Sequence, residues 1–240
     1  MTSEKQKPIL KDTCLAAIVR DEEMNPAGGI VDFIDCNVPY LERAVIVDTG
    51  SVDRTREILE EAQTKHDNLE VYDKTFKGFA NARNYSLKKA RKNSKYALVL
   101  DADERLFEDD FEDLENKMGD IETGFNFKIS GIYPGGKKID LSENRNPRLF
   151  FNKWKNKYVG EVGEILLDPS GFSLEERGKT TNIPVEIKHF LPVEKVYNKK
   201  INEFYNKIIC RGFLKDFPQL SECPSFKEWK QLNPERERYN

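Results

Sequence analysis

Leu98-Val99-Leu100-Asp101-Ala102-Asp103-Glu104 is the stretch from which the fold can be inferred, because an apolar run ends there abruptly in acidic residues. The run is too short for a helix and predicts a buried strand. Buried carboxylates are costly unless they face water, a cation or a ligand crevice. In open α/β sheets that crevice lies beyond the carboxyl ends of the strands. The stretch therefore predicts an α/β sheet with a binding site at this acidic end, where the Asp-x-Asp oxygens suit Mg²⁺ or Mn²⁺.

The residues before this stretch alternate between short apolar runs and helical patterns. Helical spacing covers residues 30–34, the segment that follows Asp53, and residues 80–92. Asp53 is a candidate cap for the second of these helices. The expected strands are residues 13–19, 44–47, 69–72 and 96–100. This order predicts a mostly parallel sheet with helices on both faces.

The pattern changes after Glu104. Residues 107–118 predict an acidic helix whose Phe111 and Leu114 face inward. Further strands are expected at 124–133 and 138–141, joined by a turn at Pro134-Gly135-Gly136, and at 148–152 and 185–189. A long helical pattern with an apolar stripe then covers residues 193–214. We expect one continuous α/β domain with a small antiparallel section and a C-terminal helical extension.

Composition excludes several classes of protein. The formal net charge of -3 argues against a nucleic-acid binder that relies on overall basic charge. No apolar stretch approaches the ~20 residues of a membrane span, and the polar start is followed by no signal-peptide core. We therefore expect a cytoplasmic protein. The four cysteines form no Cys-x-x-Cys pair, and two histidines without His-Glu-x-x-His leave little basis for a zinc enzyme.

Polar clusters follow four successive predicted strands, so we expect them to meet at one edge of the sheet. An Asp carboxylate can accept hydrogen bonds from the N–H groups of a nucleobase edge, and Asp101 can accept them from ribose hydroxyls. Asp103 can bind a divalent cation, and Arg83 can form charge-assisted hydrogen bonds to a diphosphate. Alternatives remain, since Asp48 and Asp53 also suit a turn and a helix cap, and Arg83 also suits a surface ion pair. The clusters are Arg20-Asp21-Glu22-Glu23, residues 48–55, residues 77–84 and Asp101-Ala102-Asp103.

These motifs resemble the family 2-like nucleotide-sugar glycosyltransferases of the GT-A fold. The resemblance covers residues 13–106, and a weaker match runs from Pro147 to Glu164, where Gly163 stands at a position that is usually histidine. It implies a UDP-, GDP- or dTDP-sugar donor with Mn²⁺ or Mg²⁺. The sugar would move to a hydroxyl of a glycan, lipid-linked or protein acceptor, with inversion. It also implies that residues 1–106 form the half of the domain that binds the nucleotide-sugar. Residues 107–192 would form the half that binds the acceptor and closes the metal site, and residues 193–240 a C-terminal helical extension.

The resemblance also implies a role for individual residues. Asp103 would be the main metal ligand, helped by Asp101 and His189, although His189 equally suits a structural role beside Phe190. Glu164 would be the base that deprotonates the acceptor, with Glu161 as the second candidate, although both also suit an ordinary strand edge. The expected donor contacts are Arg20, Glu22, Asp48, Ser51, Asp53, Arg83, Asp101 and Ala102.

The same residues have other interpretations. A haloacid-dehalogenase-type phosphatase also uses Asp-x-Asp after a strand, but Arg105 and the late position of the motif disfavour it. The segment from Gly131 to Lys138 lacks the Ser or Thr of a P-loop, and the acids after Asp101 lack the glycine of a calcium-binding loop. A non-catalytic nucleotide-sugar or glycan-binding module stays open because of Gly163. The 193–214 helix can pack on the core or rest peripherally on a membrane.

Overall fold

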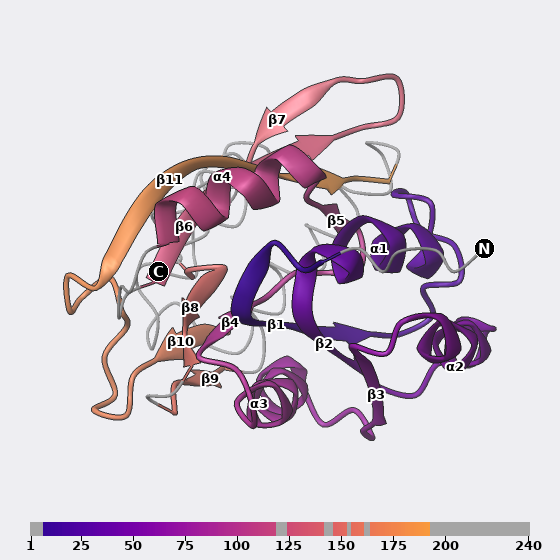
Figure 1. The fold of residues 1–240 in the computed structure, drawn as a ribbon, viewed down its shortest axis with the longest axis horizontal. Coiled ribbons are helices and arrows are strands. Elements are labelled where there is room, and N and C mark those ends of the chain that lie inside the picture. Colours follow the sequence, from indigo (N-terminus) through magenta and orange to yellow (C-terminus); the bar gives the residue numbers. More distant parts are fainter. Residues whose placement is uncertain (1–6, 119–123, 142–145, 153–154, 161–163, 193–240) are drawn as a thin grey trace, which may run out of the picture.

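A nine-stranded sheet organises the chain, in the order β3-β2-β1-β4-β8-β6-β11-β5 with β7 paired to β6 (Figure 1). The computed structural model describes residues 7–118, 124–141, 146–152, 155–160 and 164–192. A separate hairpin consists of β9 (Lys157–Val159) and β10 (Ile165–Leu167). The sheet strands are β1 (Leu10–Val19), β2 (Leu41–Asp48), β3 (Leu69–Asp73), β4 (Tyr96–Leu98), β5 (Glu104–Arg105), β6 (Gly124–Ile132), β7 (Lys138–Asp140), β8 (Leu149–Phe151) and β11 (Thr180–Phe190).

The strand directions divide the sheet into two regions. β1 runs parallel to both β2 and β4, and β2 runs parallel to β3. β8 then enters antiparallel between β4 and β6, and β5 pairs antiparallel with the end of β11. The prediction of a mostly parallel sheet with a small antiparallel section is confirmed. One sheet spans both of the expected halves, whose separate functions stay a prediction.

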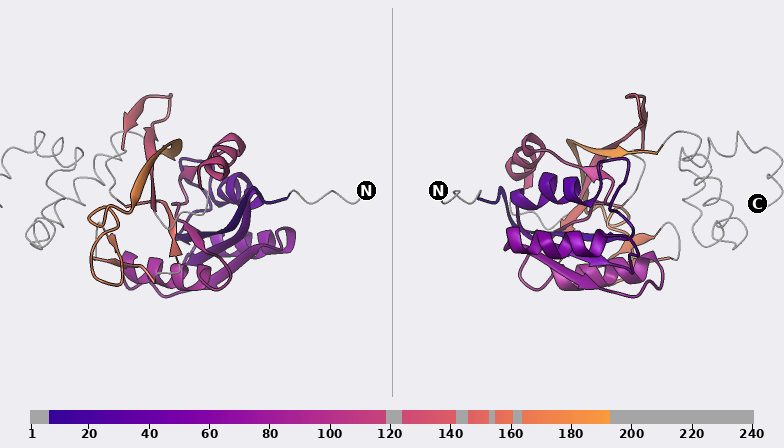
Figure 2. Two further views of the ribbon diagram at one scale, coloured as in Figure 1. Left: turned by 60° about the vertical axis from the view of Figure 1, so that its left-hand side comes forward. Right: turned by 90° about the vertical axis from the view of Figure 1, so that its right-hand side faces the viewer.

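Helices cover both faces of the sheet, as expected from the alternation of the side chains (Figure 2). Leu15 and Ala17 of β1 face α1 (Ile30–Asn37), α2 (Thr55–Lys65) and α4 (Glu108–Met118). Cys14 and Ala16 face the opposite way, toward α3 (Phe79–Ala90) and the β9–β10 hairpin. The sheet is therefore buried on both faces, which explains the nearly continuous apolar runs of its parallel strands.

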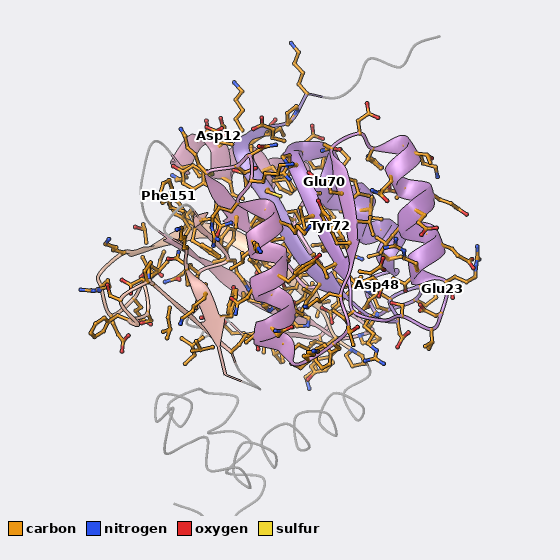
Figure 3. All side chains as sticks on the ribbon, turned by 90° about the horizontal axis from the view of Figure 1, so that it is seen from below. Asp12, Glu23, Asp48, Glu70, Tyr72 and Phe151 are labelled. Carbon is orange, nitrogen blue, oxygen red and sulfur yellow. The ribbon has the colours of Figure 1, made fainter. Side chains whose placement is uncertain are left out.

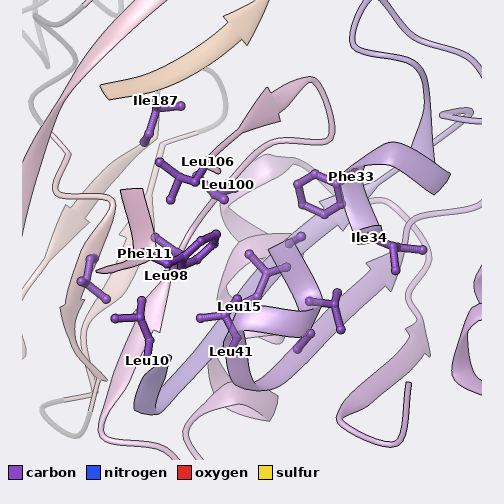
Figure 4. Packing of buried hydrophobic residues seen from close by; sticks show 14 of the residues in the cluster. Leu10, Leu15, Phe33, Ile34, Leu41, Leu98, Leu100, Leu106, Phe111 and Ile187 are labelled. Carbon is purple, nitrogen blue, oxygen red and sulfur yellow. The ribbon is translucent and has the colours of Figure 1, made fainter. Parts of the chain in front are cut away.

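The larger core lies on the face of α1, α2 and α4, and Figure 4 shows part of it. Phe33 of α1 and Phe111 of α4 are fully buried there with Leu15 and Leu98. Burying a side chain of this size contributes roughly 1.5–3 kcal/mol to stability. Phe111 and Leu114 both face inward, so the predicted amphipathic helix is confirmed.

Register brings the polar clusters to one edge. Val19 pairs with Asp48 and Asp48 pairs with Asp73, so β1, β2 and β3 end together. At the far side of the sheet His189 of β11 pairs with Glu104 of β5. A residue late in the chain is thereby placed beside the acidic turn after β4. The two-residue strand β5 that does this was not predicted, because such a short pairing leaves no periodic pattern.

Three further expectations concern helices. Helix α1 covers the expected residues 30–34 and gives way to a 3-10 turn at Val38–Tyr40, which contains Pro39. Helix α2 begins after Arg54, and Asp53 stands one residue before that cap position. The helix expected at 193–214 lies outside the described residues. In the part of the chain that is described, no helix is long and apolar enough to cross a membrane.

Candidate functional site

The loops that follow β1 and β2 are joined by hydrogen bonds. Ser51 Oγ accepts from the backbone N–H of Asp21 at 3.0 Å. Asp53 accepts from the backbone N–H of Glu23 at 3.0 Å and, through its other oxygen, from that of Thr55 at 2.9 Å. Asp53 therefore satisfies the first turn of α2 and holds the neighbouring loop. Ser51 and Asp53 are both expected to contact the nucleotide-sugar. In this arrangement their side chains accept hydrogen bonds from the protein backbone.

Asp48 is buried at the end of β2, with 3% of its surface exposed. Its Oδ1 accepts from the backbone N–H groups of Gly50 and Ser51, at 3.0 and 2.9 Å, and from Ser51 Oγ at 2.8 Å. Gly50 has a φ of +106°, a conformation that favours glycine. The carboxylate is therefore fixed in the turn, and Figure 3 shows it at the same end of the sheet as Glu23. Its contact with a nucleobase stays a prediction.

Arg83 of α3 bridges two carboxylates. Its Nη2 donates to Asp101 Oδ1 and its Nε to Glu164 Oε1, both at 2.6 Å. Only 11% of the Arg83 side chain is exposed. Burial works against the charged guanidinium, but Asp101 and Glu164 outweigh it and raise the pKa of Arg83 further. The described residues provide no hydrogen-bond partner for the buried Nη1 of Arg83.

Asp101 contacts a second arginine, Arg148. Arg148 Nη2 lies 3.6 Å from Asp101 Oδ2 and 2.5 Å from Oε1 of Glu104, a residue with no exposed side-chain surface. The other oxygen of Glu104 accepts from the backbone N–H of Asp101 at 2.9 Å. Burial alone would raise the pKa of the Asp101 carboxyl, but Arg83 and Arg148 hold it well below its usual range. Asp101 is therefore a fixed, ionised carboxylate.

Asp103 faces His189. Their side chains are 3.3 Å apart, from Oδ2 to Nε2, and His189 Nδ1 lies 3.7 Å from Glu104 Oε1. Burial lowers the pKa of this imidazole, but the hydrogen bond with Asp103 and the charges of the nearby acids raise it to about 9 overall. The site is thus a row of alternating charges that runs through Glu164, Arg83, Asp101, Arg148, Glu104, His189 and Asp103.

The chemistry of these side chains fits a metal only in part. Among the described residues no group of three or more His, Cys, Asp or Glu side chains could hold a metal ion. Asp103 and His189 come together, whereas the carboxylate of Asp101 is bound to Arg83. Mg²⁺ commonly uses one or two protein ligands and takes the rest from phosphates and water, and imidazole suits several transition metals. Because metal binding releases protons from its ligands, Asp103 and His189 fit a cation that arrives with a diphosphate and displaces the imidazole proton.

Glu164 is placed by the β9–β10 hairpin, directly before β10. Asn84 of α3 binds that hairpin, since its side chain donates to the Tyr158 carbonyl at 2.8 Å and accepts from the Tyr158 N–H at 2.7 Å. Glu164 is mostly buried, with 13% of its side chain exposed. Its Oε1 is bound to Arg83, and no described residue donates to its Oε2. Glu161 and Gly163 lie outside the described residues.

Three further residues, Arg20, Glu22 and Ala102, are predicted to contact the nucleotide-sugar. The Arg20 side chain is 51% exposed and its Nε is 3.6 Å from Asp21 Oδ2. Glu22 Oε2 accepts from Asn25 Nδ2 at 2.9 Å. Ala102 is buried, and its carbonyl accepts from Asn25 and Arg105. Their contacts with a donor stay predictions.

Several residues that build the site are not among those expected from the sequence. Glu104 and Arg148 form its buried ion pair, and Asn84 attaches the hairpin. Arg148 stands immediately before the apolar run of β8, and a charge there is a signal that was available. Asn25 and Arg105 had no such signal, because both act through backbone carbonyls of distant segments.

The comparisons with solved structures concern the fold. TarS from S. aureus is similar over 75% of this chain and 36% of its own, with 15% identity and a TM-score of 0.53. A structure of TarS residues 1–349 in complex with UDP is similar over 75% of this chain and 60% of its own, with 15% identity and a TM-score of 0.52. The mannosyltransferase PcManGT from Pyrobaculum calidifontis, in complex with GDP-Man and Mn²⁺, is similar over 84% of this chain and 64% of its own. The identity is 15% and the TM-score is 0.54.

At these identities the likeness shows the fold alone, and the expected GT-A-like class is confirmed. The chain spans between 36% and 65% of the length of the TarS structures that it matches. The search of curated proteins finds no match. The family model described as glycosyl transferase family 2 matches residues 37–201, which is more than half of the chain and includes Arg83, Asp101, Asp103, Glu164 and His189. The chain therefore belongs to glycosyl transferase family 2.

Proposed function

We propose that this chain transfers a sugar from a nucleotide-diphosphate sugar to an acceptor hydroxyl, in a metal-dependent reaction with inversion. The observation that carries the proposal is the placement of Asp101 and Asp103 at the carboxyl edge of the sheet, beside Arg83 and His189. Family membership and the GT-A-like fold support it. UDP in one TarS structure and GDP-Man with Mn²⁺ in the mannosyltransferase support the class of donor.

The donor would lie along the edge formed by the ends of β1, β2 and β4. Asp48 is rigid enough to select an N–H donor on a base edge, and Asp101 is an ionised acceptor for ribose hydroxyls. Arg83 carries a buried N–H without a partner in the described part, which suits a diphosphate oxygen. Asp103 and His189 would hold Mn²⁺ or Mg²⁺, which when bound neutralises charge on the departing diphosphate.

Inversion in one displacement needs a base on the acceptor side. The acceptor oxygen would form a bond to the anomeric carbon while the bond to the nucleotide diphosphate breaks. The hydroxyl proton would pass to Glu164, whose Oε2 receives no hydrogen bond from the described residues. Glu161 remains the second candidate. The acceptor would be a glycan, a lipid-linked sugar or a protein.

One observation favours a binding module instead. Glu164 Oε1 is bound to Arg83 Nε at 2.6 Å, so this oxygen of the carboxylate already has a partner. In a transferase this contact must loosen when the donor arrives, because the diphosphate competes for the guanidinium. In a binding module Glu164 would serve only to hold Arg83.

Calorimetry with UDP, GDP and dTDP, each with Mn²⁺ or with a chelator, tests the proposal. We expect one of the three to bind, and to bind more tightly with Mn²⁺. Slow Mn²⁺-dependent hydrolysis of the matching nucleotide-sugar would then indicate a transferase, whereas tight binding with no turnover across acceptors would indicate the binding module. Failure to bind any of the three would overturn both, and hydrolysis of an aryl phosphate would favour a phosphatase.

A further inference from the structure

Arg105 is a buried arginine that binds backbone instead of acids. Its residue surface is 2% exposed. Nη1 donates to the carbonyls of Ala102 and Glu104 at 2.7 and 2.9 Å, and Nη2 donates to those of Ala27 and Gly29, both at 3.0 Å. No described carboxylate is in ion-pair contact with it, and burial lowers its pKa. A buried charge held by four carbonyls is costly unless the two segments it joins stay in place.

Asn25 makes the complementary contact from the other segment. Its Nδ2 donates to the Ala102 carbonyl at 2.9 Å, the same oxygen that accepts from Arg105. Its Oδ1 accepts from the backbone N–H groups of Ala27 and Gly29 at 2.8 and 3.0 Å. Asn25 and Arg105 therefore connect the loop between β1 and α1 to the acidic turn through shared partners.

The loop at residues 22–30 is itself closed and tightly packed. The Ile30 N–H donates to the Glu22 carbonyl at 2.8 Å. Gly29 has a φ of +93°, and a Cβ there would stand 2.3 Å from the Glu23 carbonyl oxygen. The loop has little freedom to adjust, so it can serve as a fixed support for what it contacts.

The acidic turn receives this support at its centre. Ala102, whose carbonyl binds Asn25 and Arg105, lies between Asp101 and Asp103. A hydrogen bond from the Glu104 N–H to the Asp101 carbonyl, at 2.9 Å, closes the turn. A shift of the Ala102 peptide would move both carboxylates relative to Arg83 and His189. We propose that Asn25 and Arg105 are positioning residues, which lock the β1–α1 loop to the acidic turn. They would thereby hold Asp101 and Asp103 in place for a metal-bound diphosphate, a role that rests on the proposed function.

The chemistry of the arginine is specific to this task. A guanidinium presents N–H groups in a rigid fork and can reach four carbonyls at once, whereas a lysine offers one ammonium group. Arg105→Lys therefore keeps the charge and removes the bridge. Arg43→Lys is the matched control, because Arg43 is also mostly buried and donates to a backbone carbonyl, that of Ala90 at 3.1 Å, but lies away from this turn.

Hydrogen exchange on the full chain tests the lock without any ligand. Asn25→Ala should speed exchange of the Glu104 amide, and Arg105→Lys should speed that of the Ala27 and Gly29 amides, by about fivefold or more in each case. Each change then appears in the segment that does not carry the substitution. Arg43→Lys should leave all three amides unchanged. Faster exchange only in the substituted segment would overturn the lock. If Arg105→Lys does not fold, Asn25→Ala decides, because Asn25 is only partly buried.

Calorimetry tests the positioning role. Groups that orient metal ligands typically contribute about 10–100-fold to metal affinity. We expect Asn25→Ala and Arg105→Lys to weaken Mn²⁺-dependent binding of the nucleoside diphosphate selected by the wild type by about tenfold, and to change binding in chelator much less. If the variants lose the same affinity for the nucleoside diphosphate with and without Mn²⁺, or lose none, the positioning role is overturned. If the wild type binds no nucleoside diphosphate, the proposed function is overturned instead. The hydrogen-exchange experiment would still test whether Asn25 and Arg105 lock the β1–α1 loop to the acidic turn.

Discussion

Glu104 and Arg148 form a buried ion pair under the acidic turn, with 2.5 Å between Glu104 Oε1 and Arg148 Nη2. The two residues come from β5 and from the segment directly before β8, and Glu104 also accepts from the backbone of Asp101. The pair therefore joins the edge of the sheet that carries His189 to the strand end that carries Asp101. Its stability can be measured apart from any reaction.

Arg148→Met should lower the free energy of unfolding by about 3–5 kcal/mol, because it leaves Glu104 as an uncompensated buried charge. The double variant Glu104→Gln with Arg148→Met should recover part of that loss, since residue 104 then carries no charge that lacks a partner. Urea unfolding followed by circular dichroism measures both. If the loss in the double variant equals the summed losses of Arg148→Met alone and Glu104→Gln alone, the two charges are not coupled.

His189 should give the metal-free chain a distinct pH dependence. Its folded pKa of about 9 lies above the ordinary 6.5, so the protonated imidazole stabilises the fold. That contribution, on the order of 3 kcal/mol, is fully present below pH 6.5 and is lost as the pH rises through about 9. NMR titration in chelator measures the pKa directly, and His66 is the only other histidine. In Asp103→Asn the pKa of His189 should fall, and an unchanged value would contradict the pairing.

Much of the fold could be predicted because burial on both faces leaves long apolar runs. The parallel strands follow from apolar runs that alternate with helical patterns, and the amphipathic helix with Phe111 and Leu114 follows from its helical spacing. β5 could not be predicted, because its pairing with β11 depends on contacts between residues far apart in the chain.

The same reason limits what could be predicted of the site. Asp101, Asp103 and Arg83 stand at predicted strand and helix ends, so their meeting follows from the order of the strands. The contact between Arg83 and Glu164 depends instead on the hairpin that Asn84 holds, and the position of a hairpin is set by tertiary packing.

Asp103→Asn should reduce Mn²⁺-dependent nucleotide affinity by about tenfold or more, because it removes the carboxylate charge from the proposed metal pair. Binding in the presence of a chelator should change little. Asp73→Asn is the control, since the Asp73 side chain is 70% exposed and, within the described part of the chain, forms an ion pair only with Arg56. If calorimetry with Mn²⁺ gives Asp103→Asn the affinity of the wild type, Asp103 is not a metal ligand.

Glu164→Gln should preserve donor binding and slow sugar transfer by about 100-fold or more, because an amide still accepts from Arg83 but cannot take the acceptor's proton. Steady-state kinetics should show the loss in kcat, and calorimetry should show a similar Kd for the donor nucleotide. Glu175→Gln in the same part of the chain is the control, since Glu175 is exposed and away from Arg83. A loss of donor affinity equal to the loss of kcat would mean that Glu164 acts by holding Arg83. Near wild-type transfer would exclude Glu164 as the base and leave Glu161 to be tested in the same way.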